Sequence, residues 1–219
     1  MKTLTVHKVI FRTDELFELQ LERETIQFEP GSCLALFNDD ESRPYSIASG
    51  TGEDKLRFLL RQVVDGTVSQ WLALRKPGDK VQVSAPFGWF RPGAAIGSRS
   101  VFIATGTGIA PFLSYFRSHS LAPPECCLYG VRRCVEAFNL EELQRVKNFS
   151  LALSQEQTDD HFYGRVTGLL EQIPLADDIH YYLCGLDAMI AETSVWLENH
   201  GVAYTQIHRE IFFYEDEQH

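Results

Sequence analysis

The sequence predicts two domains of unlike fold: a barrel or sandwich of six antiparallel strands with one short helix in residues 1–95, and a doubly wound α/β domain with a parallel sheet in residues 96–219. Up to about residue 90, short segments alternate polar with apolar residues between turn clusters, which is typical of antiparallel sheets. After the connector WFRPGAAIGSRS, continuous apolar strands alternate with helical segments, which is typical of βαβ units. A chain of 219 residues is long enough for two domains with separate cores.

Six short segments are the expected strands of the first domain: LTVHKVIFRT, LFELQLER, SCLALFN, RPYSIAS, LRFLLRQVV and DKVQVSAP. The clusters EPGS, GTGED and KPGD supply turns between strands, and the amphipathic segment SQWLALR is expected to form a short helix. Short strands at this spacing predict an antiparallel barrel or a sandwich.

The second domain is expected to alternate strands with helices. The expected strands are SVFIAT, CCLYGV, FSLALS, HYYLCG and TQIHREIFF. The expected helices are APFLSYFRSHS, LEELQRVKN, VTGLLEQI and DAMIAETSVWLENH, the last of which is followed directly by Gly201, a suitable C-terminal stop. Because parallel strands are joined by crossover helices, this order predicts a parallel sheet covered by helices.

Composition and charge exclude several classes of protein. Hydrophobic residues make up 44% of the chain and charged residues 23%, as in a globular protein. The net charge of −10 argues against nucleic-acid binding, which needs a basic stripe. No apolar run approaches the roughly 20 residues that span a membrane, and polar residues interrupt the start too early for a signal peptide. We therefore expect a cytoplasmic protein.

The cysteines and histidines do not have the spacing of a metal site. The five cysteines include no C-x-x-C pair and no plant-type iron–sulfur spacing, and their odd number without an export signal suggests reduced thiols. The histidines at 161, 180, 200 and 208 are likewise scattered. We expect neither a metal ion nor an iron–sulfur cluster.

The stretch VFIATGTGIAPF is the first candidate for a ligand site. A buried strand runs into Gly106, Thr107 and Gly108, and then into a helix whose first turn holds Pro111. Glycines let a backbone approach a phosphate group, a helix start offers unpaired N–H groups, and proline costs nothing there. A glycine pair alone is usually a tight turn, but between a strand and a helix of an α/β domain it favours a nucleotide-pyrophosphate site.

Two candidates come from the later strands. Cys184 and Gly185 close a central strand at the sheet edge where ligands bind, although a buried cysteine is commonly only a small apolar residue. Glu210 and Phe212 lie in the last expected strand, where a glutamate and an aromatic residue at this spacing usually have no functional role.

Two more candidates come from the first domain. Gly66, Thr67, Val68 and Ser69 open the short helix and suit an anion, although a serine at this point is often only an N-cap. The segment Arg43-Pro44-Tyr45-Ser46 places a cation, an aromatic ring and a hydroxyl on one short strand, which is also compatible with an ordinary edge strand.

The order of these segments resembles the ferredoxin–NAD(P) reductase superfamily. The motifs are Arg43-x-Tyr45-Ser46, Gly66-x-x-Ser69, Gly106-Thr-Gly108-Ile-Ala-Pro111, Cys184-Gly185 and Glu210-x-Phe212. Five motifs in this order across nearly the whole chain are far more specific than any one of them. The resemblance implies that the first domain is a six-stranded antiparallel β-barrel that binds flavin and that the second binds a nicotinamide dinucleotide. FAD and NAD(P)H would be the cofactors, with the flavin ring in the cleft between the domains.

The resemblance also implies roles for the residues of the first domain. Arg43 would neutralise the flavin pyrophosphate, for which a forked and permanently charged donor is well suited. Tyr45 would lie against the isoalloxazine ring, and the Ser46 hydroxyl would lie near flavin N5. Thr67 and Ser69 would complete the pyrophosphate cradle.

In the second domain, the resemblance implies that Thr107 and Gly108 face the nicotinamide cofactor. Cys184 would lie beside nicotinamide C4, and Glu210 near the ring edge as a polar or proton-relay group. Phe212 matches the carboxy-terminal aromatic residue that can cover the flavin. Because the chain continues through two further aromatic residues to an acidic tail, the identity of the stacking ring stays open.

The sequence indicates less clearly whether the protein uses NADP or NAD. Where NADP enzymes of the family commonly show serine-arginine after the third α/β strand, this sequence has Ser154-Gln155-Glu156-Gln157. Arg132, Arg133 and Arg165 are available to hold a 2′-phosphate instead, so we expect NAD(P)H with a slight preference for NADPH.

The function implied by the resemblance is a flavoprotein oxidoreductase that transfers hydride between NAD(P)H and FAD and single electrons to or from a separate carrier. Because the sequence has no fused iron–sulfur or haem module, we expect a ferredoxin or flavodoxin as the partner. Such partners are acidic, as this chain is, so a local basic face would be needed at the flavin edge.

Two other functions remain open. The first is an NAD(P)H:flavin reductase that uses free flavin as a substrate, against which the expected pyrophosphate cradle argues. The second is an FAD-binding electron-transfer subunit of a larger complex, for which the sequence offers little support.

Overall fold

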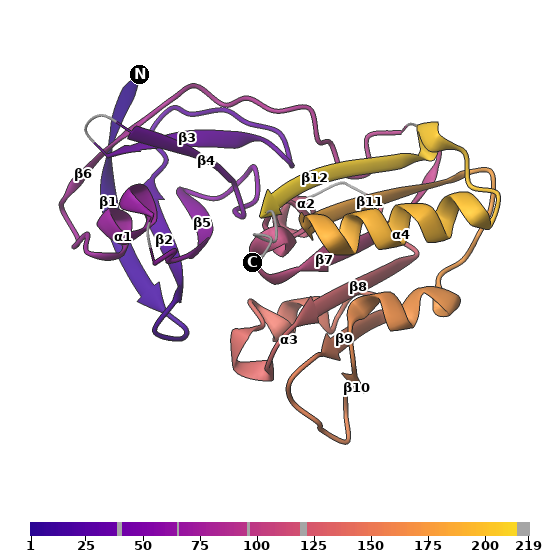
Figure 1. Ribbon diagram of the computed structural model, residues 1–219. Helices are drawn as coiled ribbons and strands as arrows, with labels where there is room; N and C mark the ends of the chain where they lie inside the picture. Colours follow the sequence, from indigo (N-terminus) through magenta and orange to yellow (C-terminus); the bar gives the residue numbers. More distant parts are fainter. Residues whose placement is uncertain (39–40, 65, 96, 119–121, 214–219) are drawn as a thin grey trace. The chain divides into compact units, whose positions relative to one another are not determined.

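The computed structural model describes residues 1–38, 41–64, 66–95, 97–118 and 122–213 (Figure 1). The contacts divide the chain into two compact units, one of Met1–Arg91 with Ala110–Leu121, and one of Pro92–Ile109 with Ala122–His219. The chain thus enters the second unit, returns to the first and enters the second again. The domain boundary at residues 95 and 96 remains a prediction.

The first unit is an antiparallel six-stranded sheet that is nearly closed into a barrel, as the sequence predicts. Its strands are β1 (Lys2–Phe11), β2 (Leu16–Glu22), β3 (Cys33–Asn38), β4 (Glu41–Ser46), β5 (Lys55–Arg61) and β6 (Lys80–Val83), in the order β4-β3-β6-β1-β2-β5. A bridge between Ile47 and Phe58 joins the two edges, because Ile47 directly follows β4 and Phe58 lies in β5. The short helix α1 (Thr67–Ala73) lies between β5 and β6 in the chain.

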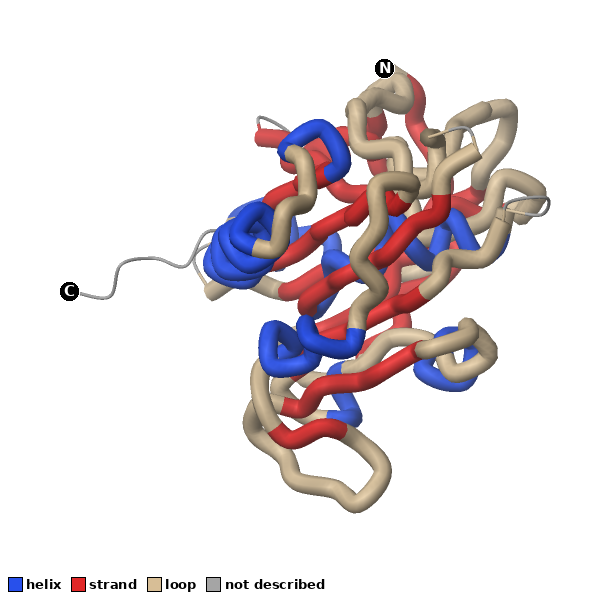
Figure 2. Tube along the Cα trace, turned by 90° about the vertical axis from the view of Figure 1, so that its right-hand side faces the viewer, coloured by secondary structure: helices blue, strands red, loops and turns tan. Residues whose placement is uncertain are grey.

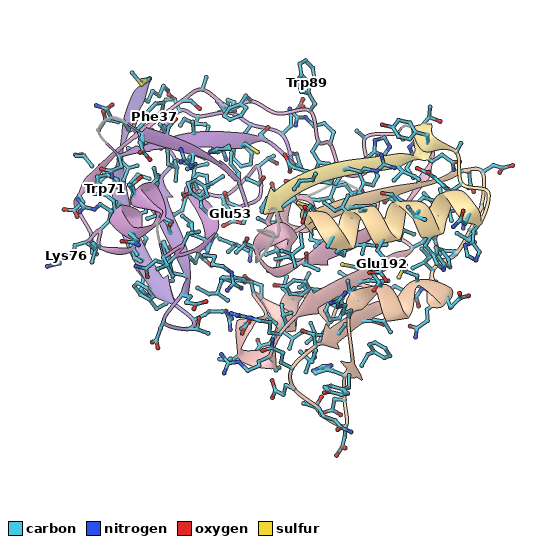
Figure 3. The ribbon with its side chains drawn as sticks, viewed as in Figure 1. Phe37, Glu53, Trp71, Lys76, Trp89 and Glu192 are labelled. Carbon is cyan, nitrogen blue, oxygen red and sulfur yellow. The ribbon has the colours of Figure 1, made fainter. Side chains whose placement is uncertain are left out.

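Alternation along the strands builds the barrel core. In β2 and β5, fully buried Phe17, Leu19 and Leu21 lie in the same apolar cluster as Leu56, Phe58 and Leu60. Helix α1 adds the buried side chains of Val68 and Leu72, which fixes the start of α1 beside the barrel. Trp71, labelled in Figure 3, packs partly against the same cluster.

The second unit is a parallel six-stranded sheet, again as predicted. Its strands are β7 (Arg99–Thr105), β8 (Cys126–Val131), β9 (Phe149–Leu153), β10 (Phe162–Tyr163), β11 (Ile179–Leu186) and β12 (Ile207–Phe213), in the order β10-β9-β8-β7-β11-β12. The chain therefore starts in the middle at β7, builds outward to β10, and then crosses to β11 on the other side. The order reverses between β7 and β11, which makes this a doubly wound sheet.

Helical segments of the second unit cover its sheet. Helix α4 (Asp187–Asn199) lies along β11 and β12 in Figure 1, and its buried Met189, Ile190 and Leu197 join the sheet residues in one core cluster. The 3₁₀ segment η3 (Val166–Gln172) contributes Leu169 and Leu170 to the same cluster. None of the helices in the described ranges is both long and apolar enough to cross a membrane.

The remaining helical segments are short, as the blue stretches of Figure 2 show. They are η1 (Gly106–Ile109), α2 (Ala110–Arg117), η2 (Cys134–Glu136), α3 (Leu140–Leu143) and η4 (Tyr204–Gln206). The predicted helix APFLSYFRSHS corresponds to α2, and its last residues lie outside the described ranges.

Two predicted local structures were wrong, and one short strand was missed. VTGLLEQI forms the 3₁₀ segment η3 and not an α-helix, and Gly168 within it packs tightly against the Phe162 ring, because a Cβ there would lie 2.9 Å from the ring. LEELQRVKN is α-helical over α3 alone and then continues as turns with i→i−3 hydrogen bonds, which end at Asn148 with φ +55°. The two-residue strand β10 was missed, because HFYGR is too short to show an alternating pattern.

Candidate functional site

Strand β4 carries the first group of predicted site residues. Successive side chains of a strand point to opposite faces, so Glu41, Arg43 and Tyr45 share one face and Ser46 lies on the other. Tyr45 packs against the barrel core, whereas the Arg43 side chain is 61% exposed. This face therefore presents an aromatic ring anchored in the core beside a solvent-facing cation.

Arg43 and Thr67 converge on one carboxylate oxygen. Arg43 Nη2 lies 3.7 Å from Glu41 Oε2, and the Thr67 hydroxyl donates a hydrogen bond to the same oxygen. Thr67 belongs to α1, which the apolar contacts of Val68 and Leu72 hold against the barrel. Two donors from separate elements can hold a phosphate oxygen in the same way, because charge-assisted hydrogen bonds to oxyanions are strong.

Tyr45 is placed to offer a rigid ring face. Burial raises the pKa of Tyr45 to about 12, and the charge of Arg43 opposes this shift by a smaller amount. The phenol is therefore neutral at pH 7. A neutral aromatic ring held by the core can stack on a flat ligand at low entropic cost.

Ser46 lies inside the barrel wall. It is 3% exposed, and its hydroxyl lies 3.1 Å from the thiol of Cys33, its partner in the β3–β4 register. The catalytic role predicted for this hydroxyl remains a prediction.

The start of α1 uses its predicted residues in different ways. Gly66 is the N-cap, and no side chain caps the helix there. The Ser69 hydroxyl is buried and accepts a hydrogen bond of 3.1 Å from the Val63 N–H, while the Val68 side chain belongs to the core. Of the two hydroxyls predicted for the anion cradle, that of Thr67 is the one that meets the Glu41 carboxylate.

The loop after β4 is fixed by α2 and by Glu53. Ser114 Oγ of α2 donates to the Ser49 carbonyl at 2.8 Å, and Arg117 Nη1 donates to the Ala48 carbonyl at 2.9 Å. Glu53, labelled in Figure 3, accepts a hydrogen bond of 2.8 Å from the Gly50 N–H. The helix that follows the glycine pair thus holds the segment directly after Arg43–Ser46, which the sequence does not reveal.

The second group of predicted residues lies where the parallel sheet reverses its order. Thr105 ends β7 and Gly106 begins η1, while Cys184 and Gly185 lie near the carboxyl end of the neighbouring strand β11. In open α/β sheets, ligands bind in the crevice outside the strand ends at such a point.

The three glycines at this point, Gly106, Gly108 and Gly185, differ in their surroundings. A Cβ on Gly108 would overlap the Cys184 carbonyl and lie 2.7 Å from the Gly185 Cα, and a Cβ on Gly185, whose φ is +136°, would overlap the Thr105 side chain. These two glycines therefore let the ends of β7 and β11 pack closely. Gly106 has a φ of +54°, and among the described residues other than its chain neighbours no heavy atom lies within 4 Å of its Cβ position, so this side of Gly106 is open.

Two residues that the sequence did not single out support this region. Thr105 Oγ1 accepts a hydrogen bond of 2.9 Å from the Leu186 N–H, and the Tyr129 hydroxyl donates one of 2.9 Å to the Gly106 carbonyl. Tyr129 lies in the middle of the predicted strand CCLYGV, so its pattern marks it only as a core residue.

Cys184 and Glu210 lie side by side in register on β11 and β12. The Cys184 thiol is buried and donates to Glu210 Oε2 at 4.0 Å. Arg209 faces the other way, because it binds Ser194 at 2.8 Å and Glu198 at 3.0 Å on α4. The alternation of β12 therefore places Glu210 on the sheet face opposite α4.

The remaining predicted residues of the second group are Thr107 and Pro111, whose side chains are buried, and Phe212. Thr107, predicted to face nicotinamide, is 2% exposed. Pro111 lies in the first turn of α2 as predicted, and it is buried. Phe212 lies beside an irregularity in the β11–β12 pairing, and Tyr214, a possible alternative to it, lies outside the described residues.

Arg132 and Ser154 are brought together at the ends of β8 and β9. The Ser154 N–H bonds the Val131 carbonyl at 3.0 Å, which draws the two loops together. Arg132 Nε lies 3.1 Å from the buried carboxylate of Glu136, and Arg133 Nε lies 3.4 Å from it.

Glu156 adds a second carboxylate to these loops. Its Oε2 accepts a hydrogen bond of 2.6 Å from the Cys134 N–H. Arg132 and Arg133 thus lie beside carboxylates that balance their charge. This balance does not favour a 2′-phosphate strongly over a 2′-hydroxyl.

Comparisons with known families agree with this two-part arrangement. An oxidoreductase FAD-binding domain matches residues 2–91, and an oxidoreductase NAD-binding domain matches residues 102–194.

Individual relatives support the same assignment. The chain is 28% identical to the toluate 1,2-dioxygenase electron transfer component of Pseudomonas putida over 85% of its own length, and spans 59% of that protein. It spans still less, 38%, of some other curated relatives. It is 26% identical to the ferredoxin–NADP reductase of Azotobacter vinelandii over 92% of both chains.

Solved structures share the fold. A ferredoxin NADP+ reductase from Neisseria gonorrhoeae with bound FAD and NADP superposes with a TM-score of 0.84 at 22% identity. The superposition covers 97% of this chain and 98% of the other.

Proposed function

Because the chain belongs to the ferredoxin–NAD(P) reductase superfamily of FAD- and NAD-binding oxidoreductases, we propose that it transfers hydride between NAD(P)H and FAD and exchanges single electrons with a separate carrier protein. The observation that carries the proposal is the convergence of Arg43 and Thr67 on one oxyanion. The Glu41 carboxylate at this point is a stand-in for a phosphate oxygen of the flavin.

The residues of the first unit fit FAD. Arg43 and Thr67 would hold the pyrophosphate, and Tyr45 would support the ring with a face fixed by the core. The contacts of α2 with Ala48 and Ser49 hold the chain directly after this strand, so the donors stand on a rigid support. A rigid support matters because small displacements of a reacting group cost much of the rate.

The residues of the second unit fit NAD(P)H. The open side of Gly106 and the reversal point between β7 and β11 would receive the dinucleotide, with Arg132 and Ser154 on its adenosine side. Cys184 and Glu210 would border the nicotinamide ring. In this arrangement Glu210 accepts the thiol hydrogen and so directs the Cys184 sulfur.

A flavin held by Arg43, Tyr45 and Thr67 would supply the chemistry that accepts a hydride and releases single electrons. The chain therefore needs to supply alignment, phosphate anchoring and exclusion of water. Burial of Cys184 and Thr107 provides water exclusion at the strand ends of the second unit.

A ferredoxin or a flavodoxin is the carrier we propose, and a cytoplasmic location remains a prediction. One relative is named an electron transfer component of a dioxygenase and is longer than this chain, which supports an electron-transfer subunit as a second candidate. A flavin reductase is a third candidate, favoured by the 61% exposure of Arg43, because an exposed anchor holds a flavin less firmly.

Anaerobic reduction tests the proposal. The purified protein is loaded with FAD and mixed with NADPH or NADH, and flavin bleaching is followed. We expect rapid bleaching, and then reoxidation on addition of ferredoxin or flavodoxin. A protein that binds no flavin, or binds it without reduction by either nucleotide, would contradict the proposal. Flavin that leaves on desalting but is still reduced in free solution would favour the flavin reductase.

A further inference from the structure

Glu41 occupies the position from which Arg43 and Thr67 would hold a phosphate. Its Oε2 atom is 3.7 Å from Arg43 Nη2 and accepts the Thr67 hydroxyl hydrogen bond. The Glu41 and Arg43 side chains are 47% and 61% exposed, so both lie at the surface of the unit. The anion-binding group of this unit is therefore already neutralised by the chain itself.

The backbone keeps the carboxylate at this place. Glu41 and Arg43 are separated by one residue on β4, so they share a face with their Cα atoms about 7 Å apart. The register of β4 with β3 fixes Glu41 opposite Asn38 and Arg43 opposite Leu36. Glu41 can turn its carboxylate away from Arg43, but it cannot leave the neighbourhood of an anion bound there.

An entering pyrophosphate meets two obstacles. It must displace the Glu41 carboxylate from Arg43 and Thr67, and it must then bind with that carboxylate still within a few ångströms. The first step costs little, because an exposed ion pair is weak. The second is a repulsion between like charges at short range, and it weakens binding by about tenfold when both charges are exposed to water with its high dielectric constant.

We propose that Glu41 is a specificity-determining residue that opposes the phosphate groups of the flavin, so that this protein holds FAD less tightly than Arg43 and Thr67 alone would hold it. The inference rests on the proposed function, because it assumes that the flavin phosphates bind at Arg43 and Thr67. It names the ligand preference of that site: the pyrophosphate of FAD gains less over the bare riboflavin unit than it would with a neutral residue at position 41.

The variant Glu41→Gln tests this directly. Glutamine keeps the length of the side chain and a carbonyl oxygen that can accept the Thr67 hydrogen bond, but it removes the charge. We measure the Kd of FAD, FMN and riboflavin by quenching of flavin fluorescence at low ionic strength. We expect Glu41→Gln to tighten FAD by about tenfold, FMN by about threefold, and riboflavin by less than about twofold.

Glu29→Gln is the matched control. Glu29 lies in the same unit and also pairs with an arginine, Arg91, at 3.0 Å, so the control removes the same charge and a comparable ion pair. It should leave the three affinities unchanged. The gain in Glu41→Gln should shrink as salt is added, because exposed charges are screened. Adding Arg43→Gln to Glu41→Gln should abolish most of that gain, because the two residues act on the same phosphates.

The outcomes separate the inference from the proposed function. If the flavins bind but Glu41→Gln leaves the Kd of FAD unchanged, or tightens riboflavin as much as FAD, the role of Glu41 is overturned while the proposed function stands. If neither the wild-type protein nor any variant binds a flavin, the proposed function fails and the inference fails with it. Equal melting temperatures of wild type and Glu41→Gln show that the comparison concerns folded protein.

Discussion

The antiparallel unit and the parallel unit present their candidate ligand groups by different means. In the first, the groups are side chains on a strand and a helix start: Arg43 and Thr67 reach outward, and the core fixes the elements below them. In the second, side chains such as Cys184 and Glu210 lie at strand ends whose backbone is closely packed, because Gly108 and Gly185 allow contacts that a side chain would block. The difference teaches that binding and folding are separable in the first unit and coupled in the second.

The largest expected effect is a loss of stability at the strand ends of the second unit. Gly185→Ala introduces a Cβ that overlaps Thr105 at a φ of +136°, and we expect the free energy of unfolding to fall by about 3–5 kcal/mol. Gly106→Ala is the matched control, since its φ is +54° but its Cβ would meet open space, and it should cost about 1–2 kcal/mol. Urea denaturation measures both. Equal losses for the two variants would break the proposed coupling.

Arg43→Ala should show the opposite behaviour in the first unit. We expect the Kd of FAD to rise by about 10- to 100-fold, the value of a hydrogen bond to a charged group, with the urea midpoint nearly unchanged. Arg91→Ala is the control, because Arg91 pairs with Glu29. Calorimetric titration with FAD and riboflavin provides the measurement. Unchanged FAD affinity would remove Arg43 from the phosphate site.

Cys184→Ala sharpens the comparison by separating reaction from binding within the second unit. The thiol lies 4.0 Å from Glu210, and its loss should slow flavin reduction by NAD(P)H about tenfold while FAD stays bound. Cys126→Ala, another buried cysteine of the same sheet, is the control. Stopped-flow single turnovers report the rate, and an unaltered rate would place Cys184 outside the reaction site.

The smallest expected effect is a pH dependence of the stability of the second unit. His208 on β12 lies 2.8 Å from His180 on β11, and burial, with a smaller contribution from His180, lowers the pKa of His208 below its usual 6.5. The unfolded chain therefore binds this proton more readily than the folded chain. The contribution of neutral His208 to the free energy of unfolding should be fully present above pH 6.5. It should decrease as the pH drops below 6.5, until the pH has passed the lower pKa of the folded state.

His208→Gln should flatten this slope in the pH range below 6.5, and His161→Gln should leave it as in the wild type. Urea midpoints at several pH values test both variants. The same slope in His208→Gln as in the wild type would show that another group carries it.

Much of the fold was predictable because local pattern and global fold agree. Alternation in LFELQLER and the continuous apolar run of SVFIAT indicated an antiparallel and a parallel sheet, and both are confirmed. The order of the motifs also gave the superfamily, which the matched FAD- and NAD-binding domains confirm. The roles assigned to single residues within those motifs remain predictions.

The failures are places where distant contacts override the local pattern. VTGLLEQI has a helical pattern, but close contact of Gly168 with Phe162 accompanies a tighter 3₁₀ turn. Thr107, predicted to face the nicotinamide cofactor, is 2% exposed, and that role remains a prediction. Ser69 accepts the Val63 N–H, a contact that the sequence does not reveal, and its role at the phosphate remains a prediction.

The sequence by itself determined the two sheet types, the superfamily and the segments that bear the candidate site, because these depend on residue type and spacing along the chain. Only the tertiary structure decided which donors meet: that Thr67 joins Arg43 on the Glu41 carboxylate, that Gly108 is needed against Cys184, and that Tyr129 holds Gly106. The physical reason is that these contacts join residues separated by 23 to 76 positions or depend on strand register, and such distances in space have no signature in a local pattern.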